Sequence, residues 1–368
     1  MRFYFRAAAF IFALIPLASN AFGWSYKEHI LFTRLAVLRL ENNPATPAAM
    51  KAWLKDIAGD LPDMAGEQEY FLHTHVGVKP EGFTGISYWT YMPDVHALTD
   101  PADSKVESFG VHERLLHFFD LEIFVEGDTK RQYKHDLSAK PKLTDFPHDM
   151  HDPRYIQSGM LPLRIEYCYQ QLVQSIRDGK LNAPSVDEQK EKTAVYWAGY
   201  LAHYLGDNTQ PQHATIDYKS QSYFANKRKA PNVHAEVEYV MCDDEKKDYM
   251  DLRQEYWPLF VKQIDDFVDP VKSKDIWESS LEVSYDSYDA LPLIGLAAMD
   301  ATGQAGTPDH PQGDAAAQID PEKFFHFRGQ FMGREMSVLE MKAIQTAWAV
   351  QRIQKVLRQA WDEAQAKQ

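Results

Sequence analysis

Apolar positions recur at spacings of three and four residues along most of the chain. The longest stretches with this periodicity predict helices at 31–40, 159–176, 188–206 and 336–361. Shorter stretches predict helices at 46–58, 232–241, 248–268 and 276–297. No alternating run of β-branched residues is long enough to predict a strand. The pattern therefore predicts an all-α fold, a multi-helix bundle joined by long loops.

Polar stretches that interrupt this periodicity predict loops at 77–86, 120–158 and 299–321. The last of these is rich in small residues and precedes a single C-terminal helix, which is too small to form a domain. We therefore expect one domain at 24–368, with a core at about 24–245 and a helical C-terminal extension at 246–368.

The first 23 residues have the pattern of a secretory signal peptide. Arg2 and Arg6 precede an apolar run at 7–18, and small residues follow at Ala21 and Gly23. The run is too short to cross a membrane comfortably, and no later stretch approaches about 20 apolar residues. We expect a secreted or periplasmic protein without a transmembrane segment, whose mature chain begins at Trp24.

The net charge bears on the binding partners of the protein, and the cysteine content bears on whether it contains a disulfide. The chain carries a formal net charge of −14, which does not favour polyanions such as nucleic acids, although bound metal ions could reverse the sign locally. The two cysteines are Cys168 and Cys242. In an oxidising compartment they could form a disulfide, and two unpaired cysteines fit the sequence equally well.

A histidine followed four residues later by a carboxylate can place both side chains on one helical face, where they reach the same metal ion. His203 and Asp207 do so on a strongly apolar helix, where burying them requires a partner or a metal. His234 and Glu238 have the same spacing in "NVHAEVEYV". The alternatives are a buried hydrogen-bonded pair for the first and a solvated helix face for the second.

The run "HYLGDNTQPQHA" resembles the signature of the zinc-dependent phospholipase C and S1/P1 nuclease superfamily. His203, Asp207 and His213 have the spacing of the family's ligands, and Gly206 and Pro211 stand where the family has them. The resemblance covers roughly 24–238 as separate short matches.

The resemblance implies further ligands in chain order. Trp24 would bind through its free α-amino group and carbonyl, and His29 follows it in "WSYKEH". The element "LLHFFD" would supply His117, and "NVHAEVE" would supply His234 and Glu238.

An aspartate upstream of the His117 element completes this set. Asp94 in "YWTYMPDV", at the end of an aromatic helix, fits best, and Asp103 in "TDPADSK" is the alternative. A glutamate at position 238 resembles the pattern of the bacterial phospholipase C branch. The short spacing from Trp24 to His29 resembles the pattern of the nuclease branch.

These residues together imply a site for three zinc ions. One ion would be held by Asp94, His117, His203 and Asp207. A second would be held by His213, His234 and Glu238. The third would be held by Trp24, His29 and Asp207, so that Asp207 bridges two ions. Zinc lowers the pKa of bound water toward ~7, and the resemblance implies hydrolysis of a phosphoester by zinc-bound hydroxide, with Asp94 also acting as general base.

The expected function is therefore a secreted, phospholipase C-like phosphodiesterase that prefers phospholipid and makes peripheral contact with a lipid surface. The alternative is an S1/P1-type single-strand nuclease or 3′-nucleotidase, in which Phe118 or Tyr91 could stack on a base. An alternative of another class is a secreted protein that binds zinc or the cell envelope without turnover.

Overall fold

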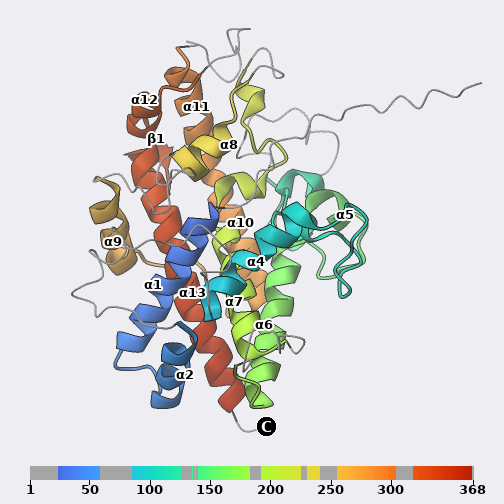
Figure 1. Ribbon diagram of the computed structural model, residues 1–368. Coiled ribbons are helices and arrows are strands. Elements are labelled where there is room, and N and C mark those ends of the chain that lie inside the picture. The colour runs from blue at the N-terminus through green and yellow to red at the C-terminus, as the bar shows by residue number, and fades with distance from the viewer. Residues whose placement is uncertain are drawn as a thin grey trace, which may run out of the picture.

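The computed structural model describes residues 24–58, 85–125, 135, 137, 140–182, 192–224, 230–240, 255–303 and 318–366. The predicted signal peptide at 1–23 and Cys242 lie outside these ranges. Within them the chain is a bundle of helices with one short β-hairpin (Figure 1). This confirms the predicted all-α class.

The helices of the N-terminal half include short 3-10 turns, labelled η. In chain order they are α1 (Tyr26–Asn42), α2 (Ala48–Ala58), α4 (Gly85–Thr99), η3 (Glu113–Leu116), η4 (Leu121–Phe124), η7 (Leu143–Asp145), α5 (Tyr155–Ser158), α6 (Leu161–Arg177) and α7 (Ala194–Asn208).

The second half begins with η9 (Pro211–Ala214), η10 (Gln221–Tyr223), α8 (Val233–Ala235) and the π-helical η12 (Glu236–Val240). It continues with α9 (Tyr256–Asp266), α10 (Ile276–Ser287), η13 (Tyr288–Ala290), α11 (Leu291–Ala301), α12 (Pro321–His326), β1 (Arg328–Phe331), β2 (Arg334–Ser337) and α13 (Val338–Gln365).

Helix α7 is the centre of the bundle because its sequence is apolar on every side. All of its residues except Tyr196 are buried, as expected for a helix without a polar face. It packs against α1, α4, α6 and α13. The close approach to α4 depends on Gly199, because a Cβ at this position would lie 2.4 Å from the Trp89 Cβ.

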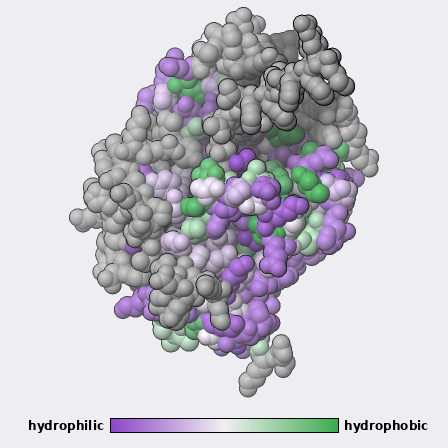
Figure 2. All heavy atoms as spheres, turned by 45° about the vertical axis from the view of Figure 1, so that its right-hand side comes forward, coloured by the Kyte–Doolittle hydropathy of each residue, from purple (hydrophilic) through white to green (hydrophobic). Residues whose placement is uncertain are grey.

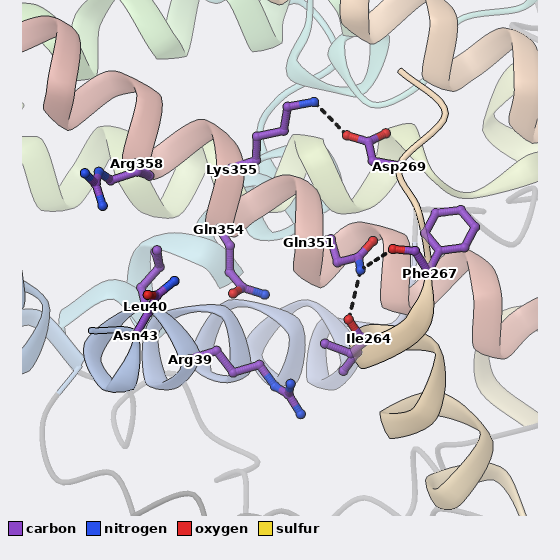
Figure 3. A pocket seen from close by; sticks show the side chains of 10 residues that line it. All are labelled: Arg39, Leu40, Asn43, Ile264, Phe267, Asp269, Gln351, Gln354, Lys355 and Arg358. Carbon is purple, nitrogen blue, oxygen red and sulfur yellow. Dashed lines mark hydrogen bonds and ion pairs between the residues drawn. The ribbon is translucent and has the colours of Figure 1, made fainter. Parts of the chain in front are cut away.

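The C-terminal helix α13 belongs to the same hydrophobic core as the N-terminal half. A capping box at Ser337 and Glu340 starts it. It then runs the length of the bundle beside α1 (Figure 1). Trp361 near its end stacks on Trp53 of α2. A different part of α13 lines an open groove shared with α1 and α9, in which Lys355 pairs with Asp269 (Figure 3).

The hairpin formed by β1 and β2 was not predicted. The strands pair antiparallel, with Arg328 opposite Ser337 and Phe331 opposite Arg334. Met332 and Gly333 connect them with φ values of 50° and 70°. Such a turn usually contains Asn-Gly or Asp-Gly, so a methionine at its first position removed the signal that would have identified it.

Several predicted boundaries also change. The predicted loop at 120–158 contains η4, η7 and α5, and the predicted helix at 276–297 is divided by η13. Of the helix predicted at 188–206, residues 188–191 lie outside the described ranges, Lys192 and Thr193 are not helical, and α7 begins at Ala194. No helix within the described ranges is both long enough and apolar enough to span a membrane.

Candidate metal centre

The last two turns of α7 place His203 and Asp207 at the middle of a buried polar cluster. The two carboxylate oxygens of Asp207 face different histidines. Asp207 Oδ1 lies 3.2 Å from His29 Nε2 on α1, whereas Oδ2 lies 3.0 Å from His117 Nδ1 and 3.3 Å from His203 Nε2. Asp207 is therefore the point at which α1, α7 and the segment after η3 meet.

Gly206 allows the His29 ring to approach α7. A Cβ at position 206 would lie 2.8 Å from His29 Nδ1, closer than packed atoms tolerate. The ring instead stacks on His203 with 3.9 Å between centroids. A glycine in this buried helix, where alanine would be the better helix former, is explained by this contact.

Helix α4 brings a second carboxylate to the cluster. Asp94 Oδ1 lies 3.7 Å from His203 Nε2 and 3.9 Å from His117 Nδ1. Asp94 lies inside α4, which continues to Thr99 beyond the internal Pro93, so its predicted position at a helix end is wrong. The alternative aspartate, Asp103, is exposed in a turn.

Two backbone carbonyls orient histidines of the cluster. His203 Nδ1 lies 2.9 Å from the Thr90 carbonyl oxygen, and His213 Nδ1 lies 2.5 Å from that of His117. If each Nδ1 donates a proton, Nε2 of the same ring is left as the acceptor or ligand atom. Thr90 was not predicted, because a contact made by a backbone carbonyl leaves no residue-type signal in the sequence.

The helix break that follows α7 turns His213 toward a second pair of side chains. Pro211 starts η9 three residues after α7 ends, and the ring centroids of His213 and His234 lie 5.4 Å apart. His234 Nε2 is 3.3 Å from Glu238 Oε2. This pair is therefore buried in the interior, and the solvated-face alternative for it is wrong.

Trp24 lies at the same end of α7. Its Nε1 donates a hydrogen bond to Thr209 Oγ1 at 3.3 Å, two residues beyond Asp207. Its ring packs edge-on against Phe32. The predicted ligands are all buried. Trp24 precedes α1, and the others come from α1, α4, the segment after η3, α7, η9, α8 and η12.

Burial and neighbouring charges set different protonation states within the cluster. Burial alone would raise the pKa of Asp207, but His203, His117 and His29 outweigh it and hold this pKa well below its usual value. Burial raises the pKa of Glu238 well above its usual value, reinforced by Asp94. Burial also lowers the pKa of His213 to about 4, so His213 is a neutral imidazole, the form that binds metals.

Several ligand-type atoms of the cluster form no hydrogen bond within the described residues. These buried atoms are Asp94 Oδ1, Asp207 Oδ1, Glu238 Oε1 and Glu238 Oε2. Histidine nitrogens do lie 3.2 Å from Asp207 Oδ1 and 3.3 Å from Glu238 Oε2. Buried carboxylate oxygens are costly unless they are hydrogen-bonded or coordinate a cation. The donor set of carboxylate oxygens and imidazole nitrogens therefore fits zinc.

Two groups within the described residues have ligand atoms that all lie within 4.8 Å of one another. They are His29 with Asp94 and His203, and His117 with His203 and Asp207. The first grouping differs from the implied assignment, which gives His29 to a separate ion with Trp24 and Asp207. His203 belongs to both groups.

Four further residues with chemically active or aromatic side chains, and Cys168, are not members of either group. His96 of α4 and Asp100, which follows the end of this helix, form a partly exposed ion pair at 3.3 Å. Tyr91 packs against Tyr26, and Phe118 is half-buried beside His117. Cys168 is buried and free, with its pKa raised by burial to about 12.

No protein-family model and no curated protein matches the chain. Among solved structures, it is similar to the alpha toxin from Clostridium absonum with a TM-score of 0.36 and 11% identity. The match covers 95% of this chain and 66% of that one. A likeness of this degree identifies neither the fold family nor the activity.

Proposed function

We propose that this protein binds zinc in the buried cluster and hydrolyses a phosphoester. The observation that supports this most strongly is the position of Asp207, whose two oxygens face separate histidines in a buried setting. A simple structural histidine–aspartate pair needs one such contact. Three histidines around one carboxylate, with a second carboxylate nearby, are better explained by ligands that share metal ions.

The proposed sites follow the implied assignment. Asp94, His117, His203 and Asp207 would hold one ion. His213, His234 and Glu238 would hold another. Trp24, His29 and Asp207 would hold the third. Bound zinc would lower the pKa of water and stabilise negative charge on a phosphoryl group.

The protein's own groups would orient these ligands and exclude water. The contacts of His203 with Thr90 and of His213 with the His117 carbonyl leave both Nε2 atoms available. Asp94 is proposed as both a ligand and the general base, because its Oδ1 has no hydrogen bond within the described residues and lies close to His203 and His117.

Phospholipid is the proposed substrate class. A chain with a net charge of −14 does not favour polynucleotides. Ile216 and Ile156 are 48% and 60% exposed, and both lie near the segment after His117. Ile216 N donates to Glu122 Oε2, and Asp120 N donates to the carbonyl of Ser158 in α5. The α5 side of the molecule shows apolar side chains among polar ones (Figure 2).

The test uses the chain beginning at Trp24, stripped with EDTA and then given zinc. Bound zinc is measured by elemental analysis, and hydrolysis is assayed in parallel on phosphatidylcholine vesicles and on single-stranded DNA. We expect lipid hydrolysis that EDTA abolishes and zinc restores. Nuclease activity without lipid cleavage would establish the alternative enzyme, and stoichiometric zinc without any hydrolysis would leave only the binding protein.

A further inference from the structure

A lysine of the C-terminal helix contacts residues next to the proposed metal ligands. Lys342 of α13 is fully buried. Its Nζ lies 2.7 Å from Glu28 Oε1 and donates a hydrogen bond to the Val237 carbonyl oxygen at 2.6 Å. It also lies 5.0 Å from the centroid of the Trp24 ring, within the range of a cation–π interaction.

Each residue that Lys342 contacts is either a proposed ligand or the direct sequence neighbour of one. Glu28 precedes His29 and closes the capping box that starts α1. Val237 precedes Glu238 in η12. Trp24 is itself a proposed ligand. One ammonium group therefore joins two regions that are far apart in the sequence, Trp24 with the beginning of α1 on one side and η12 on the other.

The energetic setting argues for a role beyond stability. A buried ion pair is often no more stabilising than a well-packed apolar pair of similar volume. The helix α13 supplies many apolar residues at neighbouring buried positions, including Val338, Met341 and Ile344. A lysine at 342 is thus a poor choice for stability alone, whereas its three directed contacts suit a residue that fixes geometry.

We propose that Lys342 is a positioning residue that holds η12, and with it Glu238, in place for metal binding. The inference rests on the proposed zinc site and assigns to the C-terminal region a part in that site. Lys342 acts through the Val237 carbonyl and Glu28, and no direct contact with substrate is implied.

The first experiment compares K342M with K355M in the chain beginning at Trp24. Lys355 lies on the same helix and pairs with Asp269 at the exposed groove of Figure 3, so K355M is the matched control. Zinc binding is titrated at buffered free zinc concentrations. Loss of residues that orient metal ligands typically weakens affinity about 10–100-fold, and we expect this for one zinc ion in K342M and no change in K355M.

The double variant E28Q/K342M separates positioning from simple stability. K342M alone leaves Glu28 buried without this cation, so its apo form should unfold at a lower denaturant concentration. E28Q removes that charge and should restore the unfolding midpoint. The Val237 carbonyl still lacks the ammonium group, so the weakened zinc affinity should persist.

Two results would overturn the inference. If zinc affinity returns to the wild-type value together with stability in the double variant, Lys342 acts only on stability. If K342M binds every zinc ion as the wild type does, it has no role in the site. A wild-type chain that binds no zinc would instead refute the metal centre itself, and the role of Lys342 with it.

Discussion

Replacing Gly206 by alanine sets two known effects against each other. Alanine is about 1 kcal/mol more favourable than glycine inside a helix, so the substitution should stabilise α7. The new Cβ, however, would lie 2.8 Å from His29 Nδ1 and 3.0 Å from Cε1. Overpacking of this kind typically costs about 1–3 kcal/mol. The His29 ring already stacks on His203 and pairs with Asp207, so displacing it disturbs both contacts. We expect G206A to be neutral or to lose up to about 2 kcal/mol.

A double-mutant cycle isolates the steric term. The wild type, G206A, H29A and G206A/H29A are unfolded with urea in EDTA, so that metal binding does not contribute. In the H29A background the clash is removed, and G206A should stabilise the protein by about 1 kcal/mol. The coupling free energy between the two sites should therefore be about 1–3 kcal/mol, within the usual range for residues in contact.

The sign of the change in unfolding free energy caused by G206A, compared between the wild-type and H29A chains, shows whether the contact with His29 requires the glycine. If G206A stabilises the wild-type chain by the same amount as the H29A chain, the glycine is not required by His29. If it destabilises both equally, the cost arises elsewhere on α7. Either result would refute the explanation of this glycine and weaken the proposed geometry at His29.

Four further predictions follow from single contacts. D207A should lose two zinc ions and H213A one, as counted by elemental analysis of the purified variants, because Asp207 is proposed to bridge two sites; equal losses would argue against bridging. Burial raises the pKa of Glu122 from 4.5 to about 7. The carboxyl group therefore favours the folded state fully below pH 4.5, where it is protonated in both states, and this contribution to the free energy of unfolding is lost as the pH rises through 7. Between pH 5 and 7 the free energy of unfolding, measured with urea in EDTA, should decline by at most about 1.4 kcal/mol per pH unit because of Glu122, and E122Q should remove this decline. If the pH dependence is unchanged in E122Q, the decline belongs to other groups. M332N should stabilise the hairpin by up to about 1 kcal/mol in the same assay, since asparagine accepts the left-handed conformation better than methionine; destabilisation would contradict this. Cys168 should resist a thiol reagent in the folded protein and react once unfolded in urea, because it is buried with a pKa of about 12; rapid labelling without denaturant would show that the site opens.

Helices could be predicted where the apolar pattern was long, and the details depended on contacts that the pattern does not contain. The periodicity at 188–206 identified α7, because a helix buried on all sides needs apolar residues on all sides. The pattern did not locate the first residue of α7, Ala194, because local hydrogen bonds determine where a helix begins. The hairpin was missed because Met332 occupies a turn position where the recognisable signal would be asparagine or aspartate.

The site shows the same division. His203 and Asp207 could be placed on one helical face because spacing along a helix is a local property. Which of Asp94 and Asp103 lies near the histidines depends on how α4 packs against α7, which the sequence left open. The contacts with the Thr90 and Val237 carbonyls had no sequence signal, because every residue has a carbonyl and only the tertiary structure selects which one accepts.

A series of buried polar contacts runs from α7 to the C-terminal helix. From α7 outward, Asp207 contacts His29, and the neighbouring Glu28 pairs with Lys342 of the C-terminal helix. Desolvating this many ionisable groups is expensive unless each has a compensating partner, and the histidine cluster still contains carboxylate oxygens without a hydrogen bond within the described residues. Lys342 compensates the negative charge of Glu28, and a cation shared among the histidines would compensate that of the carboxylates in the histidine cluster. If zinc binds as proposed, its removal should therefore destabilise the ends of α1 and η12 more than α6, a difference that hydrogen exchange with and without EDTA can measure. Uniform loss of protection over the whole bundle would contradict this picture.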